Sequence, residues 1–316
     1  MNMQKNNVSR RSVLAGAALA GVTLANGAQA ESKSVKSNSS FRFCLNTSTI
    51  RGQKKPLVEE IDIAAKAGYS GIEPWIREIQ AYQRQGGKLN DLKKRIQDAG
   101  LKVESAIGFA NWIVDDPAKR LKGLENAKRD MDRLRQIGGT RIAAPPVGAT
   151  RQTDLNLFAA ARRYGALLRL GKKMGVVPQV EVWGFSKSLS RLGEVLFVAA
   201  ESGHSDACIL PDVYHIYKGG SDFAGLELID GSAIHAFHMN DYPDKPARDK
   251  IGDADRVYPG DGVAPLKQIL QTLKRNGFQG ALSLELFNRS YWKQDALEVA
   301  KTGLAKMKSV VDRFVG

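Results

Sequence analysis

The sequence is poor in the residues and patterns that mark several common classes of protein. Its 316 residues include two cysteines, so a framework of several disulfides is excluded. No Gly-x-Gly-x-x-Gly turn occurs in CLNTSTIRGQKK, after the first predicted strand, which disfavours a doubly wound dinucleotide-binding sheet. The net charge of +14 is spread along the chain, without a long Lys/Arg block or a basic run interleaved with aromatic residues. Nucleic-acid binding is therefore not expected.

The N-terminus carries a targeting signal. Arg10 and Arg11 precede a weakly apolar Ala/Gly-rich run, and Ala28-Gln29-Ala30 forms a cleavage site of the A-x-A type. The run is too short to span a membrane, so we expect no stable membrane insertion after cleavage, with an uncleaved anchor as the alternative. We predict a twin-arginine signal peptide over residues 1–30 and a polar, Ser-rich leader over 31–40. The expected partner is the twin-arginine export machinery, and the expected location is periplasmic or otherwise exported.

Short apolar segments alternate with longer amphipathic ones from Phe41 onward. The first pair is FRFCLNTST, typical of a strand, and PLVEEIDIAAKAG, typical of a helix with Pro at its start and Gly at its end. Seven further apolar segments follow: SGIEPW, LKVESAIG, TRIAAPP, VVPQVEVW, DACILPDV, AIHAFHMND and GALSLELF. Eight strand–helix pairs predict a single α/β domain over residues 41–316, a (β/α)8 TIM barrel.

The two cysteines fit this arrangement as free thiols. Cys44 and Cys208 fall on the first and sixth predicted strands, which are not neighbours in an eight-stranded barrel. One disulfide is the alternative in an exported protein, but we expect two separate buried thiols.

Polar and ionisable residues gather where the predicted strands end. Barrel enzymes place their chemistry at the C-terminal ends of the strands. In GALSLELF, alternation puts Ser283 and Glu285 on one face and the leucines on the other, so Glu285 points to the barrel axis. The corresponding ends of other strands carry Glu73, Trp75, Glu181, Trp183, Asp212, His215 and His238.

Four of these groups fall on the consecutive strands five to eight: Glu181, Asp212, His238 and Glu285. Three carboxylates of like charge cannot converge in a dry barrel mouth without a cation. Together with one imidazole they predict a site for one divalent metal ion, with Mn²⁺ expected and Mg²⁺, Co²⁺ or Zn²⁺ as alternatives. Each residue alone is more often a salt-bridge member or a core histidine, but repetition on four strands favours the metal site.

Several segments resemble one known superfamily: GYSGIEPW, VEVW, LPDVYHI, AFHMNDYP, VYPGDG and LSLELFNRSYW. They are similar to the xylose isomerase-like barrels of sugar phosphate isomerases and epimerases. The resemblance covers most of residues 41–316, and the spacing of Asp212 and His215 is among its most specific parts. It implies a metal held by the four residues named above, with His215 on the substrate.

The resemblance also implies an activity, a divalent-metal-dependent sugar isomerase or epimerase. Such an enzyme removes a proton next to a carbonyl and forms an enediolate. Glu181 and Glu285 are the expected catalytic acid and base, and the expected substrate is a small sugar or keto-sugar. Substrate contacts are expected from five side chains: His215, Lys187, Trp75, Trp183 and Glu73.

Two positions depart from the ketose 3-epimerase branch. Lys187 stands where a second Glu is usual, and Asp244 stands where an Arg commonly follows the strand-seven histidine by six residues. The DNA-repair endonucleases of the superfamily use several metals and more histidines than the four in this chain, which disfavours that branch.

Other functions stay open on the same residues. Loss of a β-oxygen at the metal site would make a keto-sugar dehydratase, or an eliminase or hydrolase of 3-keto-glycosides. A non-catalytic, exported sugar-binding protein is the alternative from another class. The sequence also leaves a homo-oligomer open.

Overall fold

Eight short parallel strands form the centre of the structure. The computed structural model describes residues 41–316, so the predicted signal peptide (1–30) and polar leader (31–40) lie outside the described residues. The strands are β1 (Arg42–Asn46), β2 (Gly71–Glu73), β3 (Lys102–Val103), β4 (Arg141–Ala144), β5 (Val177–Glu181), β6 (Ile209–Leu210), β7 (Ala236–Met239) and β8 (Ala281–Leu284).

The strands close into a barrel in two arcs. One arc has the order β3-β2-β1-β8-β7 and the other the order β4-β5-β6. Backbone hydrogen bonds join the arcs after β3, where the N–H of Ala106 donates to the carbonyl of Arg141 at 3.1 Å. After β6, the N–H of His238 donates to the carbonyl of Pro211 at 2.9 Å. The predicted (β/α)8 fold is thereby confirmed.

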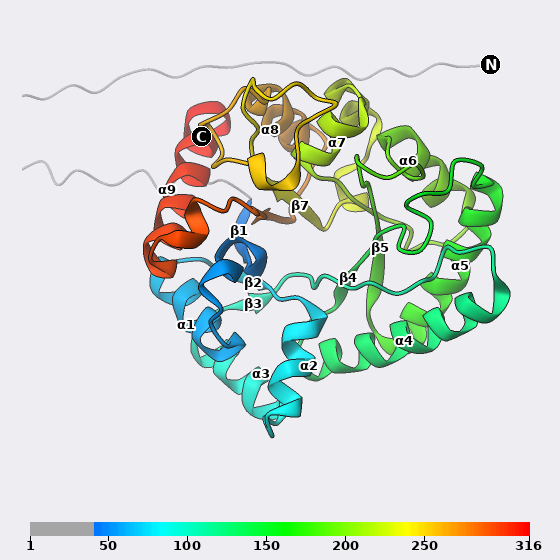
Figure 1. The fold of residues 1–316 in the computed structure, drawn as a ribbon, viewed down its shortest axis with the longest axis horizontal. Helices are drawn as coiled ribbons and strands as arrows, with labels where there is room; N and C mark the ends of the chain where they lie inside the picture. The colour runs from blue at the N-terminus through cyan, green and yellow to red at the C-terminus, as the bar shows by residue number, and fades with distance from the viewer. Residues whose placement is uncertain (1–40) are drawn as a thin grey trace, which may run out of the picture. The chain divides into compact units, whose positions relative to one another are not determined.

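Helices surround the strands on the outside (Figure 1). The α-helices are α1 (Leu57–Ala67), α2 (Ile76–Arg84), α3 (Leu89–Asp98), α4 (Pro117–Gln136), α5 (Leu157–Met174), α6 (Leu192–Glu201), α7 (Val213–Gly219), α8 (Leu266–Arg275) and α9 (Ala296–Val315). Short 3₁₀ turns are η1 (Thr47–Gln53), η2 (Phe223–Leu228), η3 (Gly231–Ala233), η4 (Asp253–Asp255) and η5 (Tyr291–Lys293). Within residues 41–316, no helix combines the length and apolar character needed to cross a bilayer.

Helix α2 is an addition to the predicted pattern, which has one helix after the second strand. It begins directly after Trp75, whose N–H donates to the Glu78 carboxylate at 2.9 Å. A glutamate three residues into a helix that accepts from the residue before it satisfies one of the free N–H groups of the first turn. This local hydrogen bond explains a helix start so close to the strand end.

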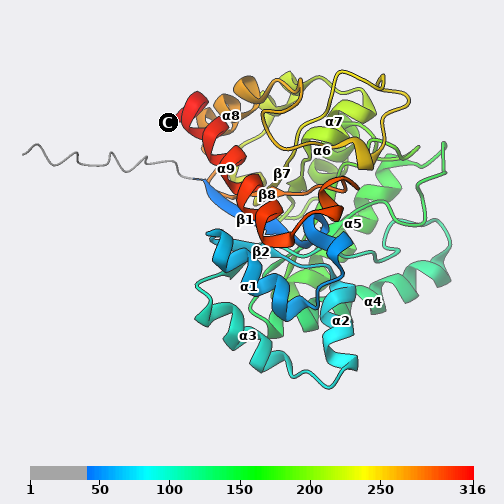
Figure 2. The ribbon, with the colours of Figure 1, turned by 60° about the vertical axis from the view of Figure 1, so that its left-hand side comes forward.

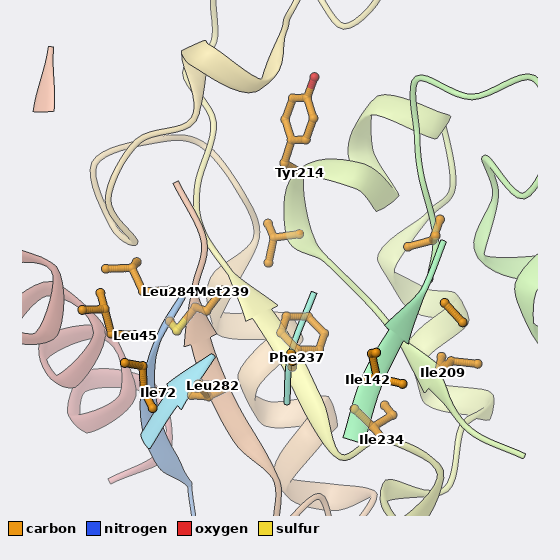
Figure 3. Close-up of a cluster of buried hydrophobic side chains, with 14 of the residues drawn as sticks. Leu45, Ile72, Ile142, Ile209, Tyr214, Ile234, Phe237, Met239, Leu282 and Leu284 are labelled. Carbon is orange, nitrogen blue, oxygen red and sulfur yellow. The ribbon is translucent and has the colours of Figure 1, made fainter. Parts of the chain in front are cut away.

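Strand β8 shows how the barrel separates apolar and polar faces. Leu282, Leu284 and Leu286 are fully buried, and Leu284 packs under α9 at Gly303, where an added Cβ would lie 2.3 Å from its Cδ2. Glycine is therefore what lets α9 approach the strands so closely. Figure 3 shows Leu45, Leu282 and Leu284 together, and Figure 2 shows α9 beside β1 and β8. Ser283 points the other way, into the barrel, as alternation predicts.

The two cysteines are free and buried, which confirms the expectation of separate thiols. Cys44 lies in β1, where it pairs with Gly71 of β2 and Ser283 of β8. Cys208 precedes β6, and its N–H lies 3.3 Å from the hydroxyl of Tyr164.

A buried glutamate, Glu60, and a half-buried one, Glu78, lie between η1, α1 and α2. Glu78 accepts from the hydroxyl of Thr47 at 2.6 Å. Glu60 in α1 is only 3% exposed, and its Oε2 has no hydrogen-bond partner among the described residues. Burial, reinforced by the charge of Glu78, raises the pKa of Glu60 to about 9.

This pKa predicts a stability that depends on pH. Folded Glu60 keeps its proton up to its pKa of about 9, whereas its ordinary pKa is 4.5, so its contribution to the free energy of unfolding falls between these values as pH rises. Glu60→Gln should therefore raise the melting temperature at pH 8 relative to the unmodified protein, with little effect at pH 4. The exposed neighbour Glu59→Gln is the control, with melting followed by circular dichroism. Equal gains at both pH values would contradict the assignment.

Candidate metal centre and active site

The four predicted metal ligands meet at one point inside the barrel mouth. His238 lies in β7 and Glu181 ends β5, while Asp212 and Glu285 follow β6 and β8. From Nδ1 of His238, the nearest carboxylate oxygens are those of Glu285 at 3.3 Å, Asp212 at 3.6 Å and Glu181 at 3.9 Å. All four side chains are buried. The fold thus brings together residues that are more than a hundred positions apart in the sequence.

The imidazole of His238 is oriented as a metal ligand would be. Its Nε2 lies 3.1 Å from the Glu73 carboxylate, while its buried Nδ1 has no hydrogen-bond partner among residues 41–316. A carboxylate on one ring nitrogen fixes the orientation and leaves the other nitrogen to a metal. Asp212, His238 and Glu285 each offer a ligand atom within 4.8 Å of one another. Three carboxylates and one imidazole suit a single divalent cation, so the residues present fit the predicted group.

Glu73 lies below this cluster rather than beside a substrate. It is fully buried, and its Oε2 also accepts from the hydroxyl of Ser283 at 2.6 Å and from the amide of Asn46 at 2.9 Å. One of its partners, Ser283, precedes Glu285 by two residues on the same face of β8. Among the described residues Glu73 contacts and orients His238, and its contact with a substrate stays a prediction.

Sequence reasoning missed Arg256, the most prominent cation of the site. Its guanidinium is 1% exposed, and Nη1 donates to Asp212 at 3.0 Å and to Glu285 at 2.9 Å. Nη2 lies 3.1 Å from Nε2 of His215 and donates to Asp253 at 2.6 Å. Burial alone would raise the pKa of Glu285, but His238 and Arg256 together hold it below its usual range.

The position of Arg256 depends on how the long loop after β7 is closed. Asp241 accepts from the N–H groups of Gly260 and Gly262 at 3.0 and 3.1 Å, and its backbone pairs with Val257 in an antiparallel bridge. Lys218 of α7 donates to carbonyls of the same loop, which lies against α7 in Figure 2. Asp244 stands six residues after His238, where an Arg is common in the ketose 3-epimerase branch, and Arg256 follows later in the same loop. The segment DRVYPGDG, with its turn glycines, was the available signal.

The remaining predicted substrate residues fall at different depths. His215 is buried against Arg256, and burial lowers its pKa. Trp75 is 8% exposed, and the guanidinium groups of Arg51 and Arg77 lie 3.8 and 4.4 Å from its ring centroid. That ring is already covered.

The two predicted residues after β5 lie nearer to solvent. Trp183 is half-buried, and its ring contacts those of Phe109 and Phe185. Lys187 is exposed, and within residues 41–316 its side chain makes no hydrogen bond or ion pair with the four ligands. The structure therefore places Trp183 at the rim of the site and does not bring Lys187 to the cluster.

Comparison with known proteins agrees with this architecture. The family described as xylose isomerase-like TIM barrel matches residues 61–310. The chain belongs to this family. An inosose isomerase of Halalkalibacterium halodurans is 26% identical over 277 residues, which are 86% of this chain and 97% of that protein. A 3-dehydroshikimate dehydratase of Pseudomonas aeruginosa is 24% identical over 245 residues, 74% of this chain but 37% of the longer relative.

Solved structures of the xylose isomerase-like family show the same fold. The crystal structure of the IolI protein with a bound zinc atom superposes with a TM-score of 0.80. The match covers 87% of this chain and all of that chain, at 22% sequence identity. A barrel with this arrangement of strands and helices is therefore common to this chain and a zinc-containing relative.

The contact between Glu73 and His238 predicts a change in metal affinity. Glu73→Gln removes the negative charge that orients and polarises the imidazole, so we expect Mn²⁺ to bind about 10- to 100-fold more weakly. Titration calorimetry on chelator-treated protein measures this, with Glu201→Gln at an exposed position of α6 as the control. Unchanged Mn²⁺ affinity in a folded Glu73→Gln variant would remove the proposed support role.

Proposed function

We propose that this protein is a divalent-metal-dependent isomerase or epimerase of a sugar or inositol-like ketone. The observation that carries the proposal is the buried, unpartnered Nδ1 of His238 facing three carboxylates. The predicted enzyme class agrees with the inosose isomerase relative, and the zinc in the IolI structure supports a divalent cation. We propose Mn²⁺ as that cation, held by Glu181, Asp212, His238 and Glu285.

A bound divalent cation supplies Lewis acidity to a substrate carbonyl. The protein's own groups then have distinct tasks, which follow from their hydrogen bonds. Both oxygens of Glu285 are engaged, Oε1 by Asn46 at 3.3 Å and Oε2 by Arg256 at 2.9 Å. Oε2 of Glu181 has no partner within the described residues. We assign proton removal from the α-carbon to Glu181 Oε2, and proton exchange on the opposite side to Glu285.

Arg256 and His215 complete the polar wall around the reacting carbons. The guanidinium of Arg256 carries N–H donors that would meet a substrate hydroxyl or oxyanion beside Asp212. Its Nη2 also contacts Nε2 of His215, which helps to fix its orientation. Because all these groups are buried, water is largely excluded, and their electrostatic effect on a developing enediolate is strengthened.

The fate of the enediolate decides the reaction. Return of the proton to the same carbon gives epimerisation, and delivery to the neighbouring carbon gives isomerisation. Loss of a β-oxygen gives dehydration or elimination of a glycosidic group. The 3-dehydroshikimate dehydratase among the relatives favours dehydration as the second candidate.

We also propose that the protein is exported by the twin-arginine route. Support comes from Arg10 and Arg11 and from the Ala28-Gln29-Ala30 site. Because this route carries folded proteins, the metal could be loaded before export. Phosphorylated sugars are scarce outside the cytoplasm, so an exported enzyme of this kind is expected to act on a substrate without phosphate.

The central prediction is metal-dependent hydrogen exchange. Mature protein with Mn²⁺ is incubated in D₂O with ketoses, inososes and 3-keto-glycosides, and deuterium next to the carbonyl is followed by NMR. We expect incorporation that a chelator abolishes. Glu181→Gln and Glu285→Gln should each slow it by about 10²- to 10⁴-fold, the usual contribution of a general acid or base.

Two controls separate the alternatives. The Glu201→Gln variant should exchange at the unmodified rate, and circular dichroism should show both active-site variants folded. Binding of a ketone without exchange by the unmodified protein would favour the sugar-binding alternative. Hydrogen exchange at the unmodified rate in Glu181→Gln would contradict the assignment of proton removal to Glu181.

Export can be tested separately from catalysis. Replacing Arg10 and Arg11 by Lys in the full chain is expected to leave the protein in the cytoplasm, because the paired arginines are the feature read by the export machinery. Fractionation followed by immunoblotting measures this, and Lys5→Arg is the control. Periplasmic recovery of the double variant at the unmodified level would contradict the route.

A further inference from the structure

Seven side chains form a closed collar around the metal cluster. Five aromatic contacts, with ring centroids 5.1–6.1 Å apart, join six of them in a row from Phe287 to His215. Arg256 closes the ring, because it contacts His215 and lies over the ring of Phe287 at 4.9 Å. The collar consists of Phe287, Trp75, Phe109, Trp183, Phe185, His215 and Arg256. These residues come from the segments that follow six of the eight strands, with His215 in helix α7, so the collar surrounds the entrance.

The collar has an apolar ledge on one side. Phe109 and Phe185 both contact Trp183, with ring centroids 6.1 and 5.1 Å apart. Phe109 is 41% exposed and Phe185 is 46% exposed, among the few large apolar side chains in the described residues that reach solvent. Contiguous exposed apolar patches mark interaction sites or ligand-binding grooves, whereas singly exposed apolar residues are ordinary.

The opposite side of the collar is polar at Arg256 and already covered at Trp75. Arg256 carries four polar contacts, and the ring of Trp75 is covered by Arg51 and Arg77. A small polyol bound at the metal would use the polar side and would leave the ledge of Phe109, Trp183 and Phe185 in water. The ledge lies directly beside the polar part of the site, because the rings of Phe185 and His215 are 5.7 Å apart.

We propose that the ledge binds a flat apolar group attached to the keto-sugar, so that the substrate is a glycoside with an aromatic or similarly apolar aglycone. The inference rests on the proposed function, because the polar end of this substrate carries the carbonyl at the metal. Aromatic faces stack on flat apolar rings in offset or tilted geometry. The exposed rings of Phe109 and Phe185 are available for such contacts.

The test compares two ligands on Mn²⁺-loaded mature protein. The 3-keto forms of phenyl β-D-glucoside and methyl β-D-glucoside are titrated by calorimetry. We expect the phenyl compound to bind about 10-fold more tightly, and Phe109→Ala and Phe185→Ala each to reduce this preference by about 2- to 10-fold, the range of one aromatic pair. Phe158→Ala is the matched control, because Phe158 on α5 is 56% exposed and contacts Phe197 instead of the collar.

Each outcome bears on the ledge alone. Equal affinities for the two compounds, no detectable binding of the phenyl compound, or a preference unchanged in both collar variants would overturn the proposal. All three phenylalanines are exposed, so melting temperatures near that of the unmodified protein are expected. Deuterium exchange with an inosose tests the metal chemistry without the ledge. Persistence of that exchange alongside equal affinities would reject the ledge and retain the proposed function.

Discussion

The structure depends on balancing four carboxylates that converge in a dry barrel. Glu73, Glu181, Asp212 and Glu285 are each at most 3% exposed, and ionised groups at such depth require opposite charge or protonation. Within the described residues the positive side is supplied by His238 and Arg256. One guanidinium spans only two of the carboxylates, while Glu181 keeps an unpartnered oxygen. A divalent cation at Nδ1 of His238 would complete this charge balance. The charge balance of the barrel interior and the proposed metal site therefore depend on the same residues.

The same balance explains the arrangement of the surrounding layers. Strand alternation sends the leucines of β8 outward onto the helices and sends Ser283 and Glu285 inward. The polar interior is therefore built at no cost to the apolar packing, since the two sets of side chains occupy opposite faces of one strand. Ser283 then holds Glu73, which holds His238, so the depth of each residue along its strand determines its task.

Local pattern was sufficient for the barrel and for the convergence of Glu181, Asp212, His238 and Glu285, because each sits at a strand end and strand periodicity fixes the face. The same pattern could not predict which contacts a strand-end residue makes inside the barrel, or where a long loop places its side chains. Glu73 and Glu285 are both strand-end glutamates next to Asn46, and they differ in that Glu73 contacts Nε2 of His238 while Glu285 faces Nδ1. Arg256 was missed because its place follows from a loop closed by Asp241, and a fixed count from His238 does not predict where such a loop returns to the site. Helix α2 arose from a single hydrogen bond to Glu78.

Arg256 contributes both to the charge balance of the buried carboxylates and to the collar around the entrance to the site. Its guanidinium lies on two of the metal-facing carboxylates and also closes the aromatic collar against Phe287. A substrate that reaches the quartet must therefore either displace this side chain or accept its hydrogen bonds. Displacement alone would leave a buried guanidinium or two buried carboxylates without partners, which costs more than a new hydrogen bond returns. A ligand whose oxygen takes over a donor of Arg256 would avoid that cost, and under the proposed function this oxygen would lie next to the carbonyl at the metal.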